Sequence, residues 1–440
     1  MARSDRASGA IGPRRTTYLR LAALSGVAAL GLAACSSGDG SSSPSASGGE
    51  TITVGVEAGA PAPEFYKSIA DRFTQETGIT VKFVDVPGTS MHETFVTDAV
   101  SASGGFDVYD LDGPWIPEFA SKGFLEPLST ALADEDRADF YPAAIDSVTY
   151  DGEVYGLPWL VHGPILYYRT DLFEQAGIDG PPTTTDELRA DAATLTDPAT
   201  GVYGTIVEGK QIAEAVSQLY DTLLQFDGNL LDDDLTVTAD SPEVKAAFDW
   251  MLGLQYDDQS SPPGAVDYDN GDVANMFLQG QVAMVKNWPY MYAMAKDPAQ
   301  STVSDSFAVA AQPVTNAVWS WSFGVAAGST HKDAATRFVQ WATSTDVLAE
   351  LGTATINPVP RSSAWDQVKA SEELTDQDKD ALAVMTQAVD QGQAVPMGPN
   401  FAAFRDRMAV VLSSIMTRQQ TPDEALSSAQ PELQSIVDGS

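Results

Sequence analysis

The chain has 440 residues, of which 24 are Lys or Arg and 61 are Asp or Glu, so its formal net charge at pH 7 is −37. A nucleic-acid-binding protein needs a basic surface to neutralise phosphates, and this acidic composition therefore excludes that class of partner. The length suffices for two domains, on a soft scale of roughly 150 residues per domain. The single cysteine, Cys35, excludes an intrachain disulfide and a metal cluster held by cysteines.

The first 34 residues have the pattern of an export signal. A basic stretch over residues 3–20 precedes an apolar run over residues 21–34, which is too short to span a bilayer comfortably, since that takes about 20 residues. The run ends in Leu-Ala-Ala-Cys, which resembles a bacterial lipobox. We therefore expect a signal peptide over residues 1–34 and lipidation of Cys35. The pair Arg14-Arg15 matches a twin-arginine signal loosely, so Sec and Tat export both stay open.

Residues 35–49 are expected to form a lipid-anchored, flexible linker. After Cys35 the sequence is rich in Ser and Gly and has no apolar periodicity, which is typical of such linkers. The anchor predicts a protein held at the cell membrane on its extracytoplasmic side. No transmembrane segment is predicted after the linker.

Strand and helix patterns alternate after residue 50. Strands are predicted over 52–56, 79–86 and 107–111, and helices over 63–77 and 92–103; the first helix carries Phe65, Ile69 and Phe73 four residues apart and stops at Gly78. This order predicts βαβ units and a parallel sheet, in which ligands bind at the carboxyl ends of the strands. Those ends fall at Glu57, at residues 86–90 and at residues 110–115.

A second α/β body is predicted from about residue 158. Its elements are a strand at 166–168, a helix around Leu188 capped by Thr184 or Thr185, and helices near 211–226 and 242–256. The segment 305–314 is strand-like and is expected to cross back toward the first body. The tail over 376–440 is mainly helical, and the fold class is α/β.

Five sequence elements resemble those of family 1 extracellular solute-binding proteins, and they occur in that family's order. They are DVYD at 107–110 with GFLEPL at 123–128, YGLP at 155–158, YYRTDLF at 167–173, FLQGQVAM at 277–284 and TPDEAL at 421–426. The resemblance covers most of residues 50–435.

The resemblance implies a two-lobed periplasmic-binding-protein-like fold with a hinge and discontinuous lobes. Lobe 1 is expected over 50–157 and about 306–345, lobe 2 over about 158–305, and a helical segment packing across both over 346–440. The implied protein is a monomer without a cofactor. It would enclose a sugar or polyol between its lobes and deliver it to the permease of an ABC importer.

Aromatic side chains at loops and strand ends are the first candidates for contact with a sugar. Sugars present apolar C–H faces to aromatic planes, and such pockets combine apolar walls with a few placed polar groups. Each candidate has the alternative of filling core. Trp319 and Trp321 are two apart on a predicted strand, so they are expected to share one aromatic wall. The candidates are Trp115, Trp159, Trp288, Trp319 and Trp321.

Polar candidates come from the strand ends, the hinge and the second body. Carboxylates that accept sugar hydroxyls form charge-assisted hydrogen bonds, but each has the alternative of a solvated loop acid or a helix cap. His162 has the alternative of a structural histidine. The candidates are Glu57, Asp110, Asp112, His162, Gln211 and Asn287.

The segment at 399–404 resembles the maltose-binding branch of the family, but Arg405 stands where that branch places a tryptophan. The maltose-type stacking set is therefore incomplete, and Arg405 is a candidate for binding hydroxyls or a carboxylate. A polyol or a carboxylated solute stays open as an alternative to a sugar.

No catalytic motif is found, and an enzyme is not expected. The chain lacks a Gly-x-Ser-x-Gly elbow, a His-Glu-x-x-His zinc motif and a phosphate-binding loop. A secreted glycoside hydrolase is kept as the enzyme alternative; it needs two carboxylates facing each other across the scissile bond.

Overall fold

The computed structural model describes residues 49–101 and 104–440. The expected signal peptide, Cys35 and all but the last residue of the expected linker lie outside the described residues. Among the helices that are described, none combines the length and the hydropathy that a membrane crossing requires. The described residues form one compact unit, which is a two-lobed α/β fold.

The larger sheet has six strands in the order β11-β10-β3-β1-β2, with β6 also paired to β10. Strand β1 is parallel to β2 and β3, as the alternating pattern predicts, whereas β10 runs antiparallel to β3 and β6. Its strands are β1 (Thr51–Glu57), β2 (Thr80–Val86), β3 (Val108–Asp112), β6 (Leu157–His162), β10 (Ala317–Val325) and β11 (Gln393–Ala394).

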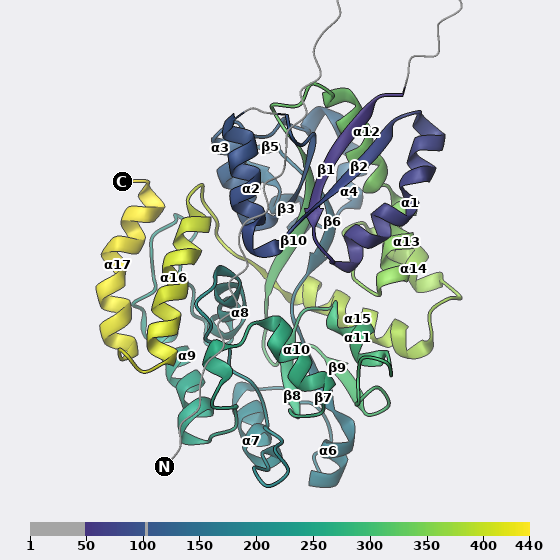
Figure 1. Ribbon diagram of the computed structural model, residues 1–440. Helices are drawn as coiled ribbons and strands as arrows, with labels where there is room; N and C mark the ends of the chain where they lie inside the picture. The colour runs from purple at the N-terminus through teal and green to yellow at the C-terminus, as the bar shows by residue number, and fades with distance from the viewer. Residues whose placement is uncertain (1–48, 102–103) are drawn as a thin grey trace, which may run out of the picture. The chain divides into compact units, whose positions relative to one another are not determined.

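Helices flank this sheet (Figure 1), and a short hairpin of β4 (Thr149–Tyr150) and β5 (Glu153–Val154) lies beside it. The helices are α1 (Pro61–Thr77), α2 (Gly88–Ser101), α3 (Ile116–Ser121), α4 (Asp134–Asp139), α5 (Pro142–Asp146), α12 (Lys332–Ala342), α13 (Thr345–Thr355) and α14 (Ser362–Ala370).

The smaller sheet is antiparallel, with β7 (Ile165–Arg169) between β8 (Met284–Asn287) and β9 (Phe307–Ala310). The strand expected at 305–314 is therefore shorter and belongs to this sheet, and the chain returns to the larger sheet between Ala310 and Ala317. The helices around it are α6 (Thr170–Ala176), α7 (Thr185–Leu195), α8 (Ala213–Leu224), α9 (Pro242–Leu252), α10 (Asn270–Leu278) and α11 (Met291–Lys296).

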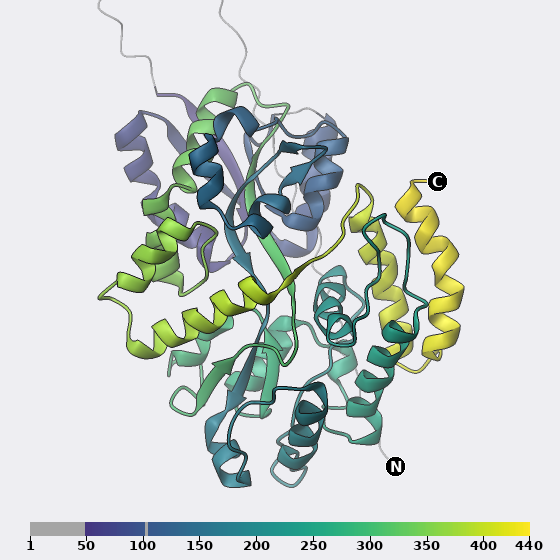
Figure 2. The same cartoon turned by 180° about the vertical axis from the view of Figure 1, so that it is seen from behind.

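The C-terminal helices connect the two halves. Helix α15 (Asp376–Gln391) packs against both β6 and β9, and Figure 2 shows it running between the two sheets. Helix α16 (Phe401–Met416) packs on α8, and α17 (Pro422–Asp438) packs on α9. Each sheet thus contacts elements that are distant in sequence.

Local signals begin and end several helices where the sequence predicts. Gly78 adopts a φ of 76°, a conformation that favours glycine, and ends α1. Thr184 caps α7 by accepting a hydrogen bond from the Glu187 backbone, and Thr421 forms a capping box with Glu424 at the start of α17.

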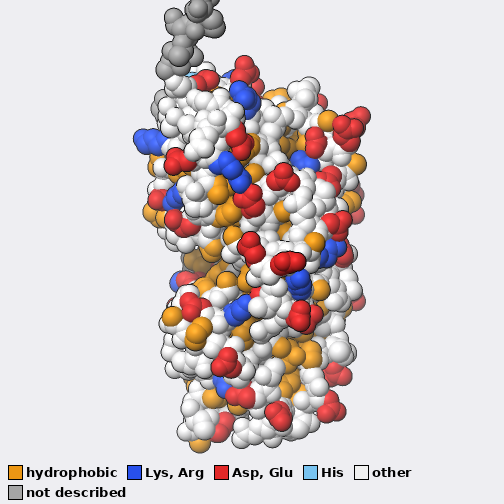
Figure 3. Space-filling view, turned by 90° about the vertical axis from the view of Figure 1, so that its right-hand side faces the viewer, with side chains coloured by type: hydrophobic (Ala, Val, Ile, Leu, Met, Phe, Trp, Pro, Cys, Tyr) orange, Lys and Arg blue, Asp and Glu red, His pale blue; other side chains and the backbone are white. Residues whose placement is uncertain are grey.

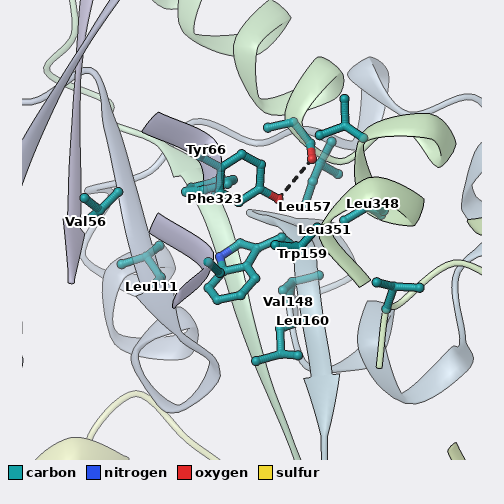
Figure 4. Close-up of a cluster of buried hydrophobic side chains, with 14 of the residues drawn as sticks. Val56, Tyr66, Leu111, Val148, Leu157, Trp159, Leu160, Phe323, Leu348 and Leu351 are labelled. Atoms are coloured by element: carbon teal, nitrogen blue, oxygen red, sulfur yellow. Dashed lines mark hydrogen bonds between the residues drawn. The ribbon is translucent and has the colours of Figure 1, made fainter. Parts of the chain in front are cut away.

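The buried face of α1 is wider than the predicted stripe. Phe73 is fully buried, Phe65 and Ile69 are partly buried against the same core, and Tyr66, which the stripe did not include, is buried as well. The Tyr66 ring lies 5.1 Å from that of Phe323, and its hydroxyl donates to the Ala342 carbonyl at 3.1 Å (Figure 4). The buried face therefore extends from the predicted stripe to these contacts with β10 and α12.

Acidic side chains are spread over the face seen in Figure 3, with Lys and Arg between them. Like charges distributed in this way repel other copies of the chain without creating one binding patch. The net charge therefore points to no ligand by itself, and the candidate site has to be built from buried groups.

Candidate ligand-binding site

Three carboxyl groups lie where parallel strands β1 and β3 end. Glu57 is the last residue of β1, and Asp110 and Asp112 are in the neighbouring β3. Asp110 is 1% exposed; one oxygen accepts from Trp159 Nε1 at 2.8 Å, and the other has no partner among the described residues. Burial raises the pKa of all three carboxyls, and Asp112 further raises that of Glu57. A ligand that donates hydrogen bonds would find acceptors here.

Arg405 joins this acidic edge to the helices of the other half. Its Nη2 lies 3.3 Å from Asp112 Oδ2, and its Nη1 donates to Ser217 Oγ of α8 at 3.0 Å. Arg405 is 6% exposed, and its Nε has no partner among the described residues. The pKa of Asp112 stays raised because burial outweighs the guanidinium charge. The Arg405 guanidinium is therefore already paired with a carboxylate of the protein. This pairing argues against a carboxylated solute, which the sequence analysis kept as an alternative ligand.

Trp288 and His162 form the aromatic part of the site. Their ring centroids are 4.8 Å apart with planes tilted by 34°, and Trp288 Nε1 donates to Glu214 Oε1 at 3.1 Å. Burial lowers the pKa of His162 to about 3, so its ring is neutral at physiological pH. Burial raises the pKa of Glu214 to about 7. These groups offer a ring face and neutral hydrogen-bonding atoms.

Two of the polar candidates, Asn287 and Gln211, are not placed to contact a ligand in this buried set. Asn287 is fully buried; its Oδ1 accepts from the Trp288 backbone at 2.7 Å, and its Nδ2 donates to the Asn270 carbonyl at 3.1 Å. Asn287 therefore positions Trp288. Gln211 is exposed just before α8 and is not part of this buried set.

The other tryptophans divide between two clusters. Trp321 lies 6.0 Å from Trp115 and 6.3 Å from Trp159, measured between ring centroids. Trp319 instead lies 5.9 Å from Tyr220 of α8 and belongs to the core of the smaller half. The single wall expected from Trp319 and Trp321 is thus split, because the two rings pack against different core clusters.

Sequence reasoning missed Glu214 and Tyr290 as site residues. Glu214 lies in the first turn of α8, and Tyr290 follows Trp288 by two residues. Burial raises the pKa of Tyr290, and the carboxylates of Glu214, Glu208 and Glu57 raise it further. Tyr290 therefore lies within reach of carboxylates from both halves. Its position two residues after the candidate Trp288 was the signal that was available.

The fold and this enclosed polar and aromatic set define a two-lobed solute-binding protein. Residues 57–349 match the family model of the bacterial extracellular solute-binding protein, and the chain belongs to that family. This confirms the resemblance on which the predicted fold class rests. A relative in Pseudomonas aeruginosa, a mannitol-binding protein, is 29% identical over 374 residues, which cover 80% of this chain and 85% of the relative.

Solved structures agree with this assignment. The maltose-bound MalE3 of T. maritima superposes with a TM-score of 0.79 at 27% identity, over 87% of this chain and 98% of that one. A solute-binding protein of an ABC transporter from Thermotoga lettingae, bound with α-D-tagatose, gives 0.79 at 27% identity, over 88% and 100%. The family and these structures consist of binding proteins rather than enzymes.

Proposed function

We propose that this protein captures a neutral carbohydrate, a short sugar or a polyol, outside the cytoplasm and delivers it to an ABC permease. The observation that carries the proposal is the buried set in which Asp112 and Arg405 connect the two halves beside Trp288 and Glu214. Relatives that bind mannitol, maltose and tagatose support the ligand class.

The charges of the site favour a neutral ligand over an anion. Arg405 is paired with Asp112, while Glu57, Asp110 and Glu214 have no cation at hydrogen-bonding distance among the described residues. An anion would have to compete with Asp112 for the guanidinium in a desolvated site. Hydroxyl groups, by contrast, donate to carboxylates and accept from Arg405 and Trp288.

Lobe closure is the proposed means of signalling to the permease. We place lobe 1 over the larger sheet, which includes β6 (Leu157–His162) and so extends past the expected boundary at 157, and lobe 2 over the smaller sheet, with α15 packing on both. A ligand that contacts both lobes shifts the equilibrium toward the closed form by its differential affinity. The proposed protein works as a monomer, as closure needs no second copy.

Titration calorimetry against a panel of mannitol, ribitol, tagatose, maltose, glutamate and glucuronate tests the proposal. Heat and saturable binding are expected for at least one neutral carbohydrate and for neither acid. Binding of the acids alone, or of nothing in the panel, would contradict the proposal. Turnover of chromogenic glycosides would favour the hydrolase alternative instead.

Trp288→Ala is expected to weaken binding of the active carbohydrate by about 1–3 kcal/mol, roughly 5- to 150-fold, because it removes the ring beside His162 and the donor to Glu214. Calorimetry measures the loss. Trp341→Ala is the matched control, since Trp341 lies on α12 and donates to Glu76 outside the site. Equal losses in both variants would mean that Trp288 acts only through stability.

Cys35→Ala is expected to release the protein from membranes without changing ligand affinity, because the thiol is the proposed site of the lipid. Fractionation of the producing cells, followed by calorimetry on the released protein, measures both effects. Ser36→Ala is the control and should stay in the membrane fraction. A Cys35→Ala protein that remains membrane-bound would rule out the lipid anchor.

A further inference from the structure

A separate cavity lies behind α8, in the smaller half. Its volume is about 60 Å3, and its walls come from α7, α8, α9 and the segment 205–208. Helix α8 presents Glu214 and Ser217 to the candidate site, and the neighbouring face with Gln218, Leu219 and Thr222 to this cavity. The candidate site and the cavity are therefore both lined by α8, but by different side chains of that helix.

Several polar atoms that line the cavity have no hydrogen-bond partner among the described residues. Gln218 is 2% exposed and both its side-chain Nε2 and Oε1 are unpartnered, and Gln312 is 7% exposed with an unpartnered Nε2. Each buried donor or acceptor left unsatisfied destabilises the folded protein, and a guest that pairs with it removes that cost. The remaining unpartnered lining atoms are Glu208 Oε2, Gln225 Oε1 and Trp250 Nε1.

This set of unpartnered atoms contains both donors and acceptors. The amide nitrogens of Gln218 and Gln312 and the indole N–H of Trp250 donate, whereas the amide oxygens of Gln218 and Gln225 accept. The cation on the wall, Lys286, donates to Thr222 Oγ1 at 3.2 Å and lies 3.8 Å from Asp221. A guest that both donates and accepts, and carries no net charge, fits these atoms best.

The apolar walls and the small volume of the cavity further restrict which neutral molecules can bind there. Leu188, Leu219, Met251 and Leu254 give the cavity apolar surface that suits C–H groups. A volume of about 60 Å3 exceeds the space of a single water and admits only a small guest. We propose that the cavity is a second binding site, which takes a neutral polyol of two or three carbons.

Saturation-transfer NMR with glycerol as the probe tests this site on the whole protein. A saturable signal is expected for the unaltered protein, with affinity at least about tenfold weaker in the double variant Gln218→Leu/Gln312→Leu, which removes the buried amides. The matched control is Gln387→Leu, an exposed glutamine on α15. Trp250→Phe removes the indole donor, keeps an aromatic ring on the wall, and serves if the double variant does not fold.

The Trp288→Ala variant distinguishes binding in the cavity from binding at the proposed carbohydrate site, because Trp288 does not line the cavity. The glycerol signal should persist there, and the Gln218→Leu/Gln312→Leu protein should keep its carbohydrate affinity. Loss of the glycerol signal in Trp288→Ala, an equal signal in the double variant, or ordered water alone in a crystal grown with glycerol would each overturn the proposal.

Discussion

Replacing Arg405 by methionine should lower the free energy of unfolding by about 3–5 kcal/mol, the cost of removing one partner of a buried ion pair. Arg405 and Asp112 have side chains that are 7% and 17% exposed, so solvent screens the pair little. The variant leaves Asp112 buried without a cation and Ser217 Oγ without its donor. Urea unfolding measures the loss, and carbohydrate binding should fail in the same protein.

A double-mutant cycle with Asp112→Asn tests whether the loss of stability in Arg405→Met comes from breaking the ion pair. Once Asp112 is neutral, Arg405→Met should cost much less, because no charge is left unpaired. Arg407→Met is the control, since Arg407 lies on the same helix and pairs with the exposed Glu432; exposed pairs contribute about 0–1 kcal/mol. Additive losses from Arg405→Met and Asp112→Asn would show that the ion pair does not couple the two halves.

The protein should be most stable at mildly acidic pH and lose about 2–3 kcal/mol of unfolding free energy between about pH 5.5 and 8. Burial raises the pKa of Glu214 and of Asp221 to about 7, from 4.5 and 3.8. The folded protein then holds protons that the unfolded chain has released, and this contribution is lost as pH rises through about 7. His162 opposes it below about pH 6.5, because burial lowers its pKa to about 3.

Urea unfolding across this pH range measures the change in stability. Charged groups near Glu214 and Asp221 also influence the pKa values of these two carboxyls. Lys286 lies 3.8 Å from Asp221, and Arg405 lowers the pKa of Glu214. Glu214→Gln and Asp221→Asn should each flatten the profile, while the exposed Glu243→Gln on α9 should leave it unchanged. A stability that rises between about pH 6.5 and 8 would contradict these assignments.

Sequence reasoning succeeded where one short segment decides its own conformation. Gly78 ends α1 and Thr421 begins α17 because the backbone groups they satisfy are adjacent in sequence. The same holds for Asp110, which was placed at a strand end by the alternation of its own neighbours. The family motifs also predicted the class of fold correctly.

Sequence reasoning failed where distant segments decide. Tyr66 joins Phe73 in the core through contacts with Phe323 and Ala342, which are far along the chain. Trp319 and Trp321 contact aromatic rings from different parts of the chain. The carboxylate that Arg405 contacts is that of Asp112, 293 residues away, and the sequence did not indicate this pairing.

The sequence by itself determined the family, the alternation of strands and helices, and the strand ends at which a ligand site was expected. Only the tertiary structure decided which charges meet there. Asp112, Arg405 and Ser217 come from three separate elements, and Glu214 meets Trp288 across 74 residues. Hydrogen bonds and burial act through space, so the balance of charge that favours a neutral ligand exists only once the chain has folded.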